Sequence, residues 1–556
     1  MTLQFSARQD NRKALLERLT AVEYDVLIIG GGITGAGIAL DATTRGMRTA
    51  LIEMQDFAGG TSSRSTKLVH GGLRYLKQFE VKMVAEVGKE RAVVYENGPH
   101  VTTPEWMLLP LYKGGTFGPF STSLGLKLYD YLAGVKRGER RSMLSADEAA
   151  AKEPLLKREG LLGGGYYVEY RTDDARLTLE VLKKAAELGV AAANYVKAEQ
   201  FHYEDGKLTG VTAVDAVTGE KLLIRAKKIV NAAGPWVDSL RELDRSRQGK
   251  TLRLTKGVHL VFDQSRFPLH QAVYFDTPDG RMIFAIPRDG KTYAGTTDTD
   301  YDGDLMNPAM TDADRDYVLD AVNGMFPSLK LKAQDVESSY AGLRPLIYEE
   351  GKSASEVSRR DEIFRSASGL ITIAGGKLTG YRKMAENVVN GIVKDLHAEG
   401  HGPYKPCVTK HLPISGGEVG GSASWPEFLR RSTEQGTKSG LTPQEAKTIA
   451  HRYGSNADQI IRLAQESAEE AKRLGLPADV YATLVYAIDK EMALRPVDFF
   501  IRRTGALFFD IEWVKRWKSP VIHAMSGLLG YSDTFRESCE EELEARLSET
   551  AHEIRQ

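Results

Sequence analysis

The chain has 556 residues, of which 42% are hydrophobic and 27% are charged. This length predicts about three or four domain-sized units, and the composition is that of a soluble globular protein, which excludes a collagen, a coiled-coil rod and a disordered chain. Lys and Arg total 74 against 75 Asp and Glu, so no basic excess predicts nucleic-acid binding, and any anion site must be local.

Cysteines and apolar runs set further limits. Cys407 and Cys539 are the only cysteines, and neither has a metal-binding spacing, so we expect no disulfide framework and no metal site. The N-terminal segment lacks the apolar core of a secretory signal, and no stretch of about 18 apolar residues predicts a membrane span. We therefore expect a cytoplasmic protein. Peripheral contact with the inner face of the cell membrane and a homodimer are both compatible with the sequence.

The first chemical signal in chain order is a strand, a glycine turn, a helix and a second strand. The apolar runs at 24–30 and 48–53 predict buried strands. Between them Gly30, Gly32 and Gly35 have the G-x-G-x-x-G spacing, which permits a tight turn, backbone approach to a pyrophosphate and close helix packing. This unit is typical of a dinucleotide-binding domain.

Glu53 ends the second strand of this unit, 23 residues after Gly30. At that place a carboxylate can accept hydrogen bonds from a ribose diol, whereas it disfavours a ribose phosphate. The unit therefore predicts NAD or FAD rather than NADP.

Three later segments favour FAD. Residues 56–76 are rich in Gly, Ser and Thr, whose hydroxyl and backbone groups suit a pyrophosphate and a flavin edge. Residues 227–238 predict a strand with a small-residue turn, and residues 369–389 predict a strand, a Gly-Gly turn and a helix whose N-terminus can stabilise a reduced flavin. Cofactor-like turns dispersed over the chain suit a long ligand. Besides Glu53 and the three turn glycines, the predicted cofactor-binding residues are Thr61, Ser62, Ser63, His70, Gly71, Gly234, Gly376, Leu378 and Thr379.

Six strings occur in order along the chain: TSSRSTKLVHGGLRYL, NAAGPWVD, KGVHLVF, GTTDTDYDGD, AGLRPL and AGGKLTGYRKMAE. Together they resemble FAD-dependent glycerol-3-phosphate dehydrogenases, and the resemblance covers nearly the whole chain from Tyr24. It implies a flavoenzyme that oxidises sn-glycerol 3-phosphate to dihydroxyacetone phosphate by hydride transfer from C2 to flavin N5 and passes electrons to a membrane quinone. The alternatives are a glycerol-phosphate oxidase using oxygen, which usually carries an inserted segment not seen here, and a flavin-binding scaffold without catalysis.

The fold that the resemblance implies is mixed α/β and D-amino-acid-oxidase-like. A Rossmann-like FAD-binding domain would be interleaved with a mixed-sheet substrate domain, and an all-helical C-terminal domain would follow. We expect the FAD-binding domain at about 20–100, 150–240 and 340–400, the substrate domain at about 100–150 and 240–340, a linker at 400–425 and the helical domain at 426–556.

A substrate site for this reaction requires a base for the hydroxyl proton and cations for the phosphate. His259 lies in an apolar run and is the favoured base, while His70 is the second candidate and is expected beside the flavin. Arg344 and Lys377 stand in turns and are predicted to act in catalysis and phosphate binding. The remaining predicted substrate-binding residues are Arg74, Tyr75 and Arg360, with Arg359 as the alternative to Arg360.

Residues 123–141 predict an amphipathic helix. Apolar residues recur at helical spacing, with basic residues beside them; these are Leu124, Leu128, Tyr131, Leu132 and Val135, and Lys127, Lys136, Arg137, Arg140 and Arg141. Such a helix can lie in an anionic membrane interface. The alternative is a surface helix whose apolar stripe packs on the FAD-binding domain.

Overall fold

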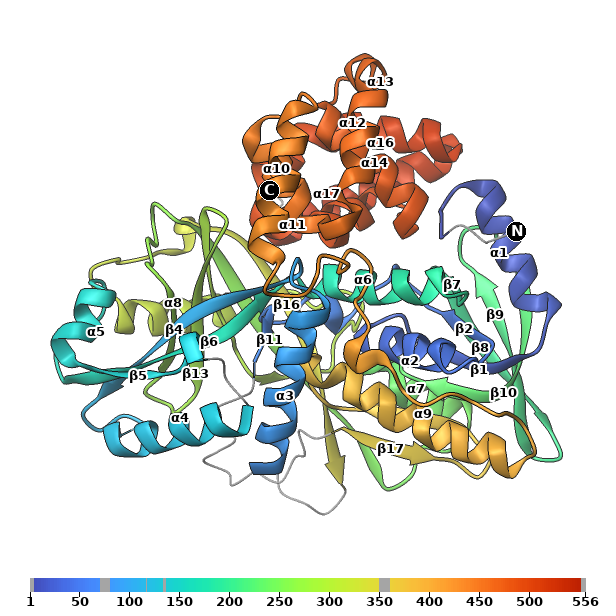
Figure 1. The fold of residues 1–556 in the computed structure, drawn as a ribbon, viewed down its shortest axis with the longest axis horizontal. Helices are drawn as coiled ribbons and strands as arrows, with labels where there is room; N and C mark the ends of the chain where they lie inside the picture. Colours follow the sequence, from blue (N-terminus) through green and yellow to red (C-terminus); the bar gives the residue numbers. More distant parts are fainter. Residues whose placement is uncertain (1–4, 71–80, 117, 134–136, 350–360, 552–556) are drawn as a thin grey trace.

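The computed structural model describes residues 5–70, 81–116, 118–133, 137–349 and 361–551. Two mixed β-sheets lie beside each other, and a group of C-terminal helices sits across one side of both (Figure 1). The N-terminal helix α1 (Gln9–Ala21) lies against the edge of the first sheet and near the C-terminal helices (Figure 1).

The first sheet has eight strands within the described residues, with the order β17-β18-β10-β1-β2-β7 and with β8 and β9 extending from β10. Its strands are β1 (Tyr24–Ile29), β2 (Thr49–Ile52), β7 (Ala191–Ala193), β8 (Val196–Glu204), β9 (Lys207–Asp215), β10 (Lys221–Asn231), β17 (Glu362–Arg365) and β18 (Ile371–Ala374). The pairs β18-β10, β10-β1, β1-β2 and β2-β7 are parallel. Parallel central strands are covered on both faces, which explains why β1 and β2 are continuous apolar runs.

Four helices of the described residues cover this sheet, and they are α2 (Ile33–Thr44), α6 (Asp174–Glu187), α7 (Val237–Leu243) and α9 (Tyr381–Ala398). Three of them, α2, α7 and α9, begin at turns that the sequence marked. Both predicted strands of the dinucleotide unit are confirmed, and so is the strand, Gly-Gly turn and helix at 369–389. Because β18 pairs in parallel with β10, the helix that follows it begins at the same edge of the sheet as α2.

The second sheet has ten strands in the described part of the chain, with the order β15-β11-β14-β13-β12-β4-β6-β3, while β16 pairs with β11 and β5 with β6. Its strands are β3 (Leu68–Val69), β4 (Thr102–Tyr112), β5 (Ser142–Ser145), β6 (Leu161–Thr172), β11 (Lys250–Asp263), β12 (Ala272–Asp276), β13 (Met282–Arg288), β14 (Lys291–Gly295), β15 (Thr299–Asp300) and β16 (Val336–Glu349). Its associated helices are α3 (Val81–Asn97), α4 (Pro119–Ala133), α5 (Ala146–Lys152) and α8 (Asp312–Met325).

The strand pairing differs from the expected domain boundaries at three places. Residues 68–69, 161–172 and 340–349 fall in the expected FAD-binding ranges, yet β3, β6 and β16 are strands of the second sheet. The reason is pairing over long distances: β6 forms an antiparallel ladder with β4, and β16 forms one along nearly the whole of β11. These two long ladders therefore decide that β6 and β16 belong to the second sheet.

Residues beyond about 425 are helical in the described part, as expected. The helices are α10 (Trp425–Lys438), α11 (Pro443–Tyr453), α12 (Ala457–Glu466), α13 (Ala468–Arg473), α14 (Ala478–Glu491), the π-helical turn η10 (Asp498–Arg503), α15 (Ala506–Phe509), α16 (Ile511–Leu529) and α17 (Asp533–Ala551). The segment expected as a linker is packed against the body, since Lys405 N donates to Arg45 O (3.0 Å) and Ile414 N to Asn97 O (3.0 Å). One continuous apolar core joins these helices to the second sheet.

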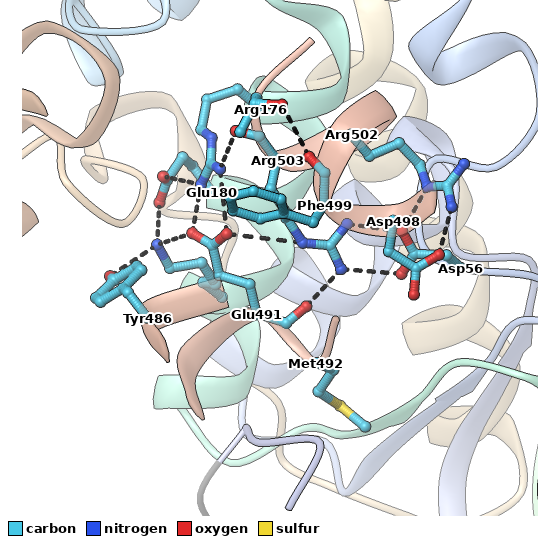
Figure 2. Close-up of polar contacts among 12 residues, drawn as sticks. Asp56, Arg176, Glu180, Tyr486, Glu491, Met492, Asp498, Phe499, Arg502 and Arg503 are labelled. Atoms are coloured by element: carbon cyan, nitrogen blue, oxygen red, sulfur yellow. Dashed lines mark hydrogen bonds and ion pairs between the residues drawn. The ribbon is translucent and has the colours of Figure 1, made fainter. Parts of the chain in front are cut away.

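A buried cluster of charged side chains also joins the C-terminal helices to the first sheet (Figure 2). Its acids are Asp56, Glu180, Glu491 and Asp498, and its bases are Arg176, Lys183, Arg502 and Arg503. All eight side chains are at most 7% exposed. The helical domain is therefore attached by both apolar and ionic contacts that exclude water.

Candidate active site

Two adjoining cavities lie where the two sheets meet. The larger, of about 770 Å³, lies over the ends of β1, β10 and β18 in the first sheet. The smaller, of about 310 Å³, lies against β11 and β16 in the second sheet. Residues lining both cavities are Thr61, Ser65, Pro345, Gly375, Gly376, Lys377 and Leu378. A ligand in one cavity would therefore meet a ligand in the other along this shared wall.

The larger cavity is built on the glycine turn between β1 and α2. Gly30 has φ +121°, and a Cβ there would lie 2.4 Å from the Ala232 carbonyl oxygen. A Cβ on Gly35 would lie 1.9 Å from the Gly30 oxygen, so only glycine lets the helix pack this closely on the strand. The turn brings the N-terminus of α2 to the cavity, where its N–H groups and positive dipole end suit a pyrophosphate.

Glu53 lines the same cavity. Its Oε2 accepts a hydrogen bond from Gly31 N (2.7 Å) and its Oε1 from Gln55 N (2.8 Å). Burial raises the pKa of the Glu53 carboxyl, although the two backbone donors act in the opposite direction. Each carboxylate oxygen keeps a second lone pair, so the group can still accept hydrogen bonds from a ribose diol.

Most of the predicted cofactor-binding residues in the described chain line these cavities. Gly30, Gly32, Glu53, Thr61, Ser62, Gly234, Gly376 and Leu378 line the larger cavity, and His70 and Thr379 line the smaller one. Ser62 Oγ also accepts a hydrogen bond from Ile33 N (3.0 Å) and so caps the start of α2. Gly71 lies outside the described residues.

Three residues depart from a simple role as ligand contacts. Ser63 lines neither cavity, because its buried hydroxyl turns back to the Gly60 oxygen (3.5 Å). Gly35 also lines neither cavity and acts through packing. The Thr379 hydroxyl accepts from His70 N (3.0 Å) and donates to His70 O (3.1 Å), so it holds the backbone of the second candidate base.

His259 lies on β11, opposite Gly295 of β14 and Tyr340 of β16, and it faces the smaller cavity. Its Nε2 is 3.0 Å from Thr66 Oγ1. The ring stacks on Tyr340 at 4.7 Å, and Tyr340 stacks in turn on Phe508 of α15 at 5.0 Å. Burial, followed by the charges of Arg344 and Lys67, lowers the pKa of His259 well below its ordinary 6.5. The imidazole is therefore neutral near pH 7.

Arg344 lies within strand β16 and not in a turn as expected, because it belongs to the long ladder with β11. It shares a face of the strand with Tyr340, four residues away. Its Nη1 donates to Thr297 O (3.1 Å) and Asp298 Oδ1 (3.1 Å), and its Nη2 donates to Thr296 Oγ1 (3.0 Å). A Cβ on Gly257 would lie 2.6 Å from Nη2, so this glycine makes room for the guanidinium. The Arg344 side chain is 32% exposed and lines the smaller cavity.

Lys377 lies in the wall shared by the two cavities, just before η7 (Leu378–Gly380). Burial lowers the pKa of His70 to about 3, and the Lys377 and Arg91 charges add to the effect. A neutral His70 cannot hold an anion by charge. The other predicted substrate residues, Arg74, Tyr75 and Arg360, and the alternative Arg359, lie outside the described residues.

Sequence reasoning missed three residues that contact the predicted ones. Thr66 bonds His259, Tyr340 stacks on it, and Asp298 pairs with Arg344. Tyr340 could have been found, because residues four apart on a strand share a face. Nothing in the sequence distinguished Thr66 and Asp298 except that they lie in the motifs TSSRSTKLVHGGLRYL and GTTDTDYDGD.

Comparisons with known proteins agree with this geometry. The profile of the family described as FAD dependent oxidoreductase matches residues 25–382, and that of the C-terminal domain of alpha-glycerophosphate oxidase matches residues 407–536. The aerobic glycerol-3-phosphate dehydrogenase of Bacillus subtilis (strain 168) is 62% identical over 526 residues, covering 95% of this chain and 94% of the relative. That of Staphylococcus haemolyticus is 57% identical over 541 residues, covering 97% of each.

The chain belongs to the FAD-dependent glycerol-3-phosphate dehydrogenase family. A solved member of this family, the glycerol-3-phosphate dehydrogenase from Bacillus halodurans complexed with FAD, is 51% identical with a TM-score of 0.87 and covers 99% of each chain. The L-alpha-glycerophosphate oxidase of Mycoplasma pneumoniae is 18% identical with a TM-score of 0.55 over 67% of this chain and 95% of its own, which shows a shared fold.

FAD is the cofactor of this family member, and the larger cavity fits it. The glycine turn and the α2 N-terminus suit the pyrophosphate, and Glu53 suits the ribose. The segment around Gly376 lies at the second helix N-terminus, where the flavin would meet the smaller cavity. The expected mixed α/β fold with a helical C-terminal domain is confirmed.

Proposed function

We propose that the chain oxidises sn-glycerol 3-phosphate to dihydroxyacetone phosphate and delivers the electrons to a membrane quinone. One observation supports the substrate assignment: the neutral imidazole of His259 and the guanidinium of Arg344 line the same cavity, which adjoins the cavity for FAD. A proton acceptor and an anion-binding group within one pocket match an alcohol that bears a phosphate.

In the proposed reaction, FAD and the side chains of the cavity have separate roles. FAD, when bound, supplies the acceptor for the hydride of the substrate C2–H bond. His259 takes the hydroxyl proton, which it can do because its ring is neutral, and Thr66 with Tyr340 fixes the plane of that ring. Loss of a hydride and a proton converts the secondary alcohol to a ketone.

Arg344 and Lys377 bind the phosphate in this proposal, together with Arg74, Tyr75 and Arg360, which the sequence resemblance supports. The planar guanidinium of Arg344 can bind two phosphate oxygens at once. Asp298, Thr296 and the Thr297 carbonyl hold it from behind, so its orientation is set before substrate arrives.

Anaerobic titration tests the reaction. sn-Glycerol 3-phosphate should bleach the yellow colour of the holoenzyme, and glycerol without the phosphate should not at the same concentration. Reoxidation by a soluble quinone should be much faster than by oxygen. Faster reoxidation by oxygen would assign the chain to the oxidases, and an unbleached flavin would overturn the substrate.

Quinone reduction requires access to a lipid surface, and α4 provides a candidate contact. Phe120 is 82% exposed, Leu124 60% and Leu128 38%, while Leu126 between them is buried against the second sheet. The exposure of Phe120 and Leu124 favours a surface contact over packing of this stripe on the protein. Exposed Lys127 lies beside this stripe.

Other parts of the predicted contact are only partly described. The side chains of Tyr131, Leu132 and Arg137, and residues Val135 and Lys136, lie outside the described part, while Arg140 is exposed. Among the helices of the described residues, none is both long enough and apolar enough to span a bilayer. We therefore propose contact from the surface, at the inner face of the cell membrane.

Vesicle sedimentation tests this contact. The enzyme should bind anionic vesicles more than neutral ones and less at high salt, since each basic residue near the surface contributes about 1 kcal/mol. Replacing both Phe120 and Leu124 by Ser should weaken binding while leaving flavin bleaching intact. Unchanged vesicle binding by that variant would exclude α4 as the contact.

A further inference from the structure

The FAD cavity rests on a loop that the helical domain holds in place. This loop follows β2 and carries Glu53, Thr61 and Ser62, all of which line the cavity. Asp56 lies three residues after Glu53 and is 1% exposed, but it lines neither cavity. A charged side chain with no access to ligand or solvent, in the middle of a cofactor loop, requires a structural explanation.

The explanation is a set of four donors around the Asp56 carboxylate, of which Figure 2 shows the two arginines. Arg503 Nη1 donates to Oδ2 (2.6 Å) and Nη2 to Oδ1 (2.9 Å), and Arg502 Nε donates to Oδ2. Asn194 Nδ2 completes the set with a bond to Oδ1 (3.0 Å). Burial alone would raise the pKa of Asp56, but the guanidinium groups of Arg503 and Arg502 outweigh it and lower that pKa. The carboxylate is therefore charged and depends on both arginines.

Both arginines come from η10 in the helical domain. This segment is a π-helical turn, in which Thr504 N bonds Phe499 O (3.0 Å), and its wider turn lets two consecutive arginines reach one carboxylate. Such turns are rare and are often found at functional sites. The sequence separation between Asp56 and Arg503 is 447 residues, so the contact exists only when the helical domain is docked.

Arg503 is held from the other side by Glu491. Arg503 Nη2 donates to Glu491 O (2.6 Å), and the Glu491 carboxylate binds Arg176 and Lys183 of α6. The cluster thus runs from the cofactor loop through η10 to a helix of the first sheet (Figure 2). Lys183 marks its far end, where it contacts Glu491, Glu180 and Tyr486 but not Asp56.

We infer that Arg502 and Arg503 are positioning residues for FAD: by neutralising Asp56 they fix the loop that presents Glu53 and Ser62, so FAD affinity depends on the docked helical domain. Loss of an arginine would leave Asp56 buried and uncompensated, and the loop would have to move to hydrate it. The carboxylate of Glu53 lies close enough to be affected by the charges of Asp56 and Arg502. Coupling of this kind is reciprocal, so bound FAD must also tighten the docking of the helical domain.

This inference concerns the cofactor alone and does not depend on which alcohol is oxidised. The test compares two substitutions, each of which removes one positive charge from the same buried cluster. Arg503→Met removes contacts to Asp56 and Glu491. Lys183→Met removes contacts to Glu491, Glu180 and Tyr486 but none to Asp56. The dissociation constant of apoenzyme and FAD is measured by quenching of flavin fluorescence.

We expect Arg503→Met to raise the FAD dissociation constant about tenfold or more, and Lys183→Met to change it less than about twofold. At saturating FAD, the KM for glycerol 3-phosphate should stay at the wild-type value in both variants. Should Arg503→Met fail to fold, Arg503→Lys keeps the charge and should raise the constant by a smaller factor, compared with Lys183→Arg as its control. Equal effects of the matched variants would overturn the inference.

A second measurement tests reciprocity without any assay of activity. Addition of FAD to the apoenzyme should slow amide hydrogen exchange at residues 491–510, and in Arg503→Met or Arg503→Lys this protection should shrink by the factor by which FAD affinity falls. If FAD does not change the rate of amide hydrogen exchange at residues 491–510 of the wild type, the helical domain and the cofactor loop are independent.

Discussion

Two Arg–Asp pairs in this enzyme use the same chemistry for different ends. The side chains of Arg503 and Asp56 are both 0% exposed, while those of Arg344 and Asp298 are 32% and 36% exposed. The first pair lies between domains with backbone and ionic partners around it. The second lies at the wall of the smaller cavity.

The difference in water access decides what each arginine can do. A guanidinium enclosed by protein groups has no room for a ligand, and its removal strands a buried carboxylate at a cost of about 3–5 kcal/mol. A half-exposed guanidinium is still partly hydrated and can exchange water for a phosphate. We therefore propose that Arg503 holds the fold around FAD and that Arg344 binds the substrate.

The chemistry in the smaller cavity should show the largest effect. His259→Ala removes the proposed base, so anaerobic flavin reduction by glycerol 3-phosphate should slow roughly 10²–10⁴-fold, as stopped-flow absorbance would show. FAD content should stay normal, because His259 lines the smaller cavity and not the larger one. Reduction at the wild-type rate would move the role to His70 or to water.

The next largest effect should distinguish Arg344 from Arg503. Arg344→Ala should weaken transition-state binding, measured by kcat/KM for glycerol 3-phosphate, by about 2–4 kcal/mol. FAD content and thermal stability should stay near wild type. Arg253→Ala is a matched control, because Arg253 lies on β11, is paired with Asp300 and lines neither cavity. Loss of flavin with unchanged substrate dependence would reverse our assignment of Arg344.

Two buried histidines, one in the smaller cavity and one beside the helical domain, predict how the stability of the folded protein depends on pH. Burial, followed by neighbouring cations, lowers the pKa of His259 in the cavity and of His100 beside the helical domain well below 6.5. Above pH 6.5 the folded and unfolded states are both neutral at these residues. Below it only the unfolded state takes up the protons, so each histidine should cost about 1.4 kcal/mol of stability per pH unit.

Thermal unfolding of the holoenzyme between about pH 7 and pH 5 measures this slope. The midpoint should fall as the pH decreases through the ordinary histidine value. His100→Gln should flatten the slope by the share of one histidine without changing flavin reduction at neutral pH. A midpoint that does not change with pH over this range would show that these histidines are protonated in the folded state.

The smallest expected effect concerns Asp298. Because this carboxylate is partly exposed, its pair with Arg344 is worth about 1 kcal/mol or less, so Asp298→Asn should raise the KM for glycerol 3-phosphate roughly twofold to fivefold with little change in kcat. Asp300→Asn, two residues along and paired with Arg253, should leave KM unchanged. A decrease in kcat equal to that from Arg344→Ala would mean that Asp298 itself takes part in the reaction.

The cofactor half of the site could be predicted from the sequence because its parts are contiguous. Gly30, Gly32, Gly35 and Glu53 fall in one strand–turn–helix–strand unit, whose spacing is set by backbone geometry. The base was proposed from its apolar strand, and the resemblance placed the cations. The site assignments themselves await the experiments above.

The rest could not be predicted because it depends on pairing across the chain. Thr66 and His259 are 193 residues apart, and Asp56 and Arg503 are 447 apart. The expected domain ranges also put β6 and β16 with the FAD-binding domain, although both strands belong to the second sheet, since the sheet that a strand joins is decided by its partner ladder rather than by its own residues. Buried charges such as Arg503 look, in a sequence, like any solvated arginine.

The column of rings formed by Phe508, Tyr340 and His259 bears on how such an enzyme can change during evolution. It runs from the helical domain to the proposed base, with spacings of 5.0 Å and 4.7 Å. A protein that lost its C-terminal helical domain would lose Phe508, and one face of the Tyr340 ring would then be exposed to water. Shortened descendants would therefore need a new aromatic or aliphatic cover at this spot before catalysis could persist, so we expect loss of the domain and replacement of residue 340 to occur together.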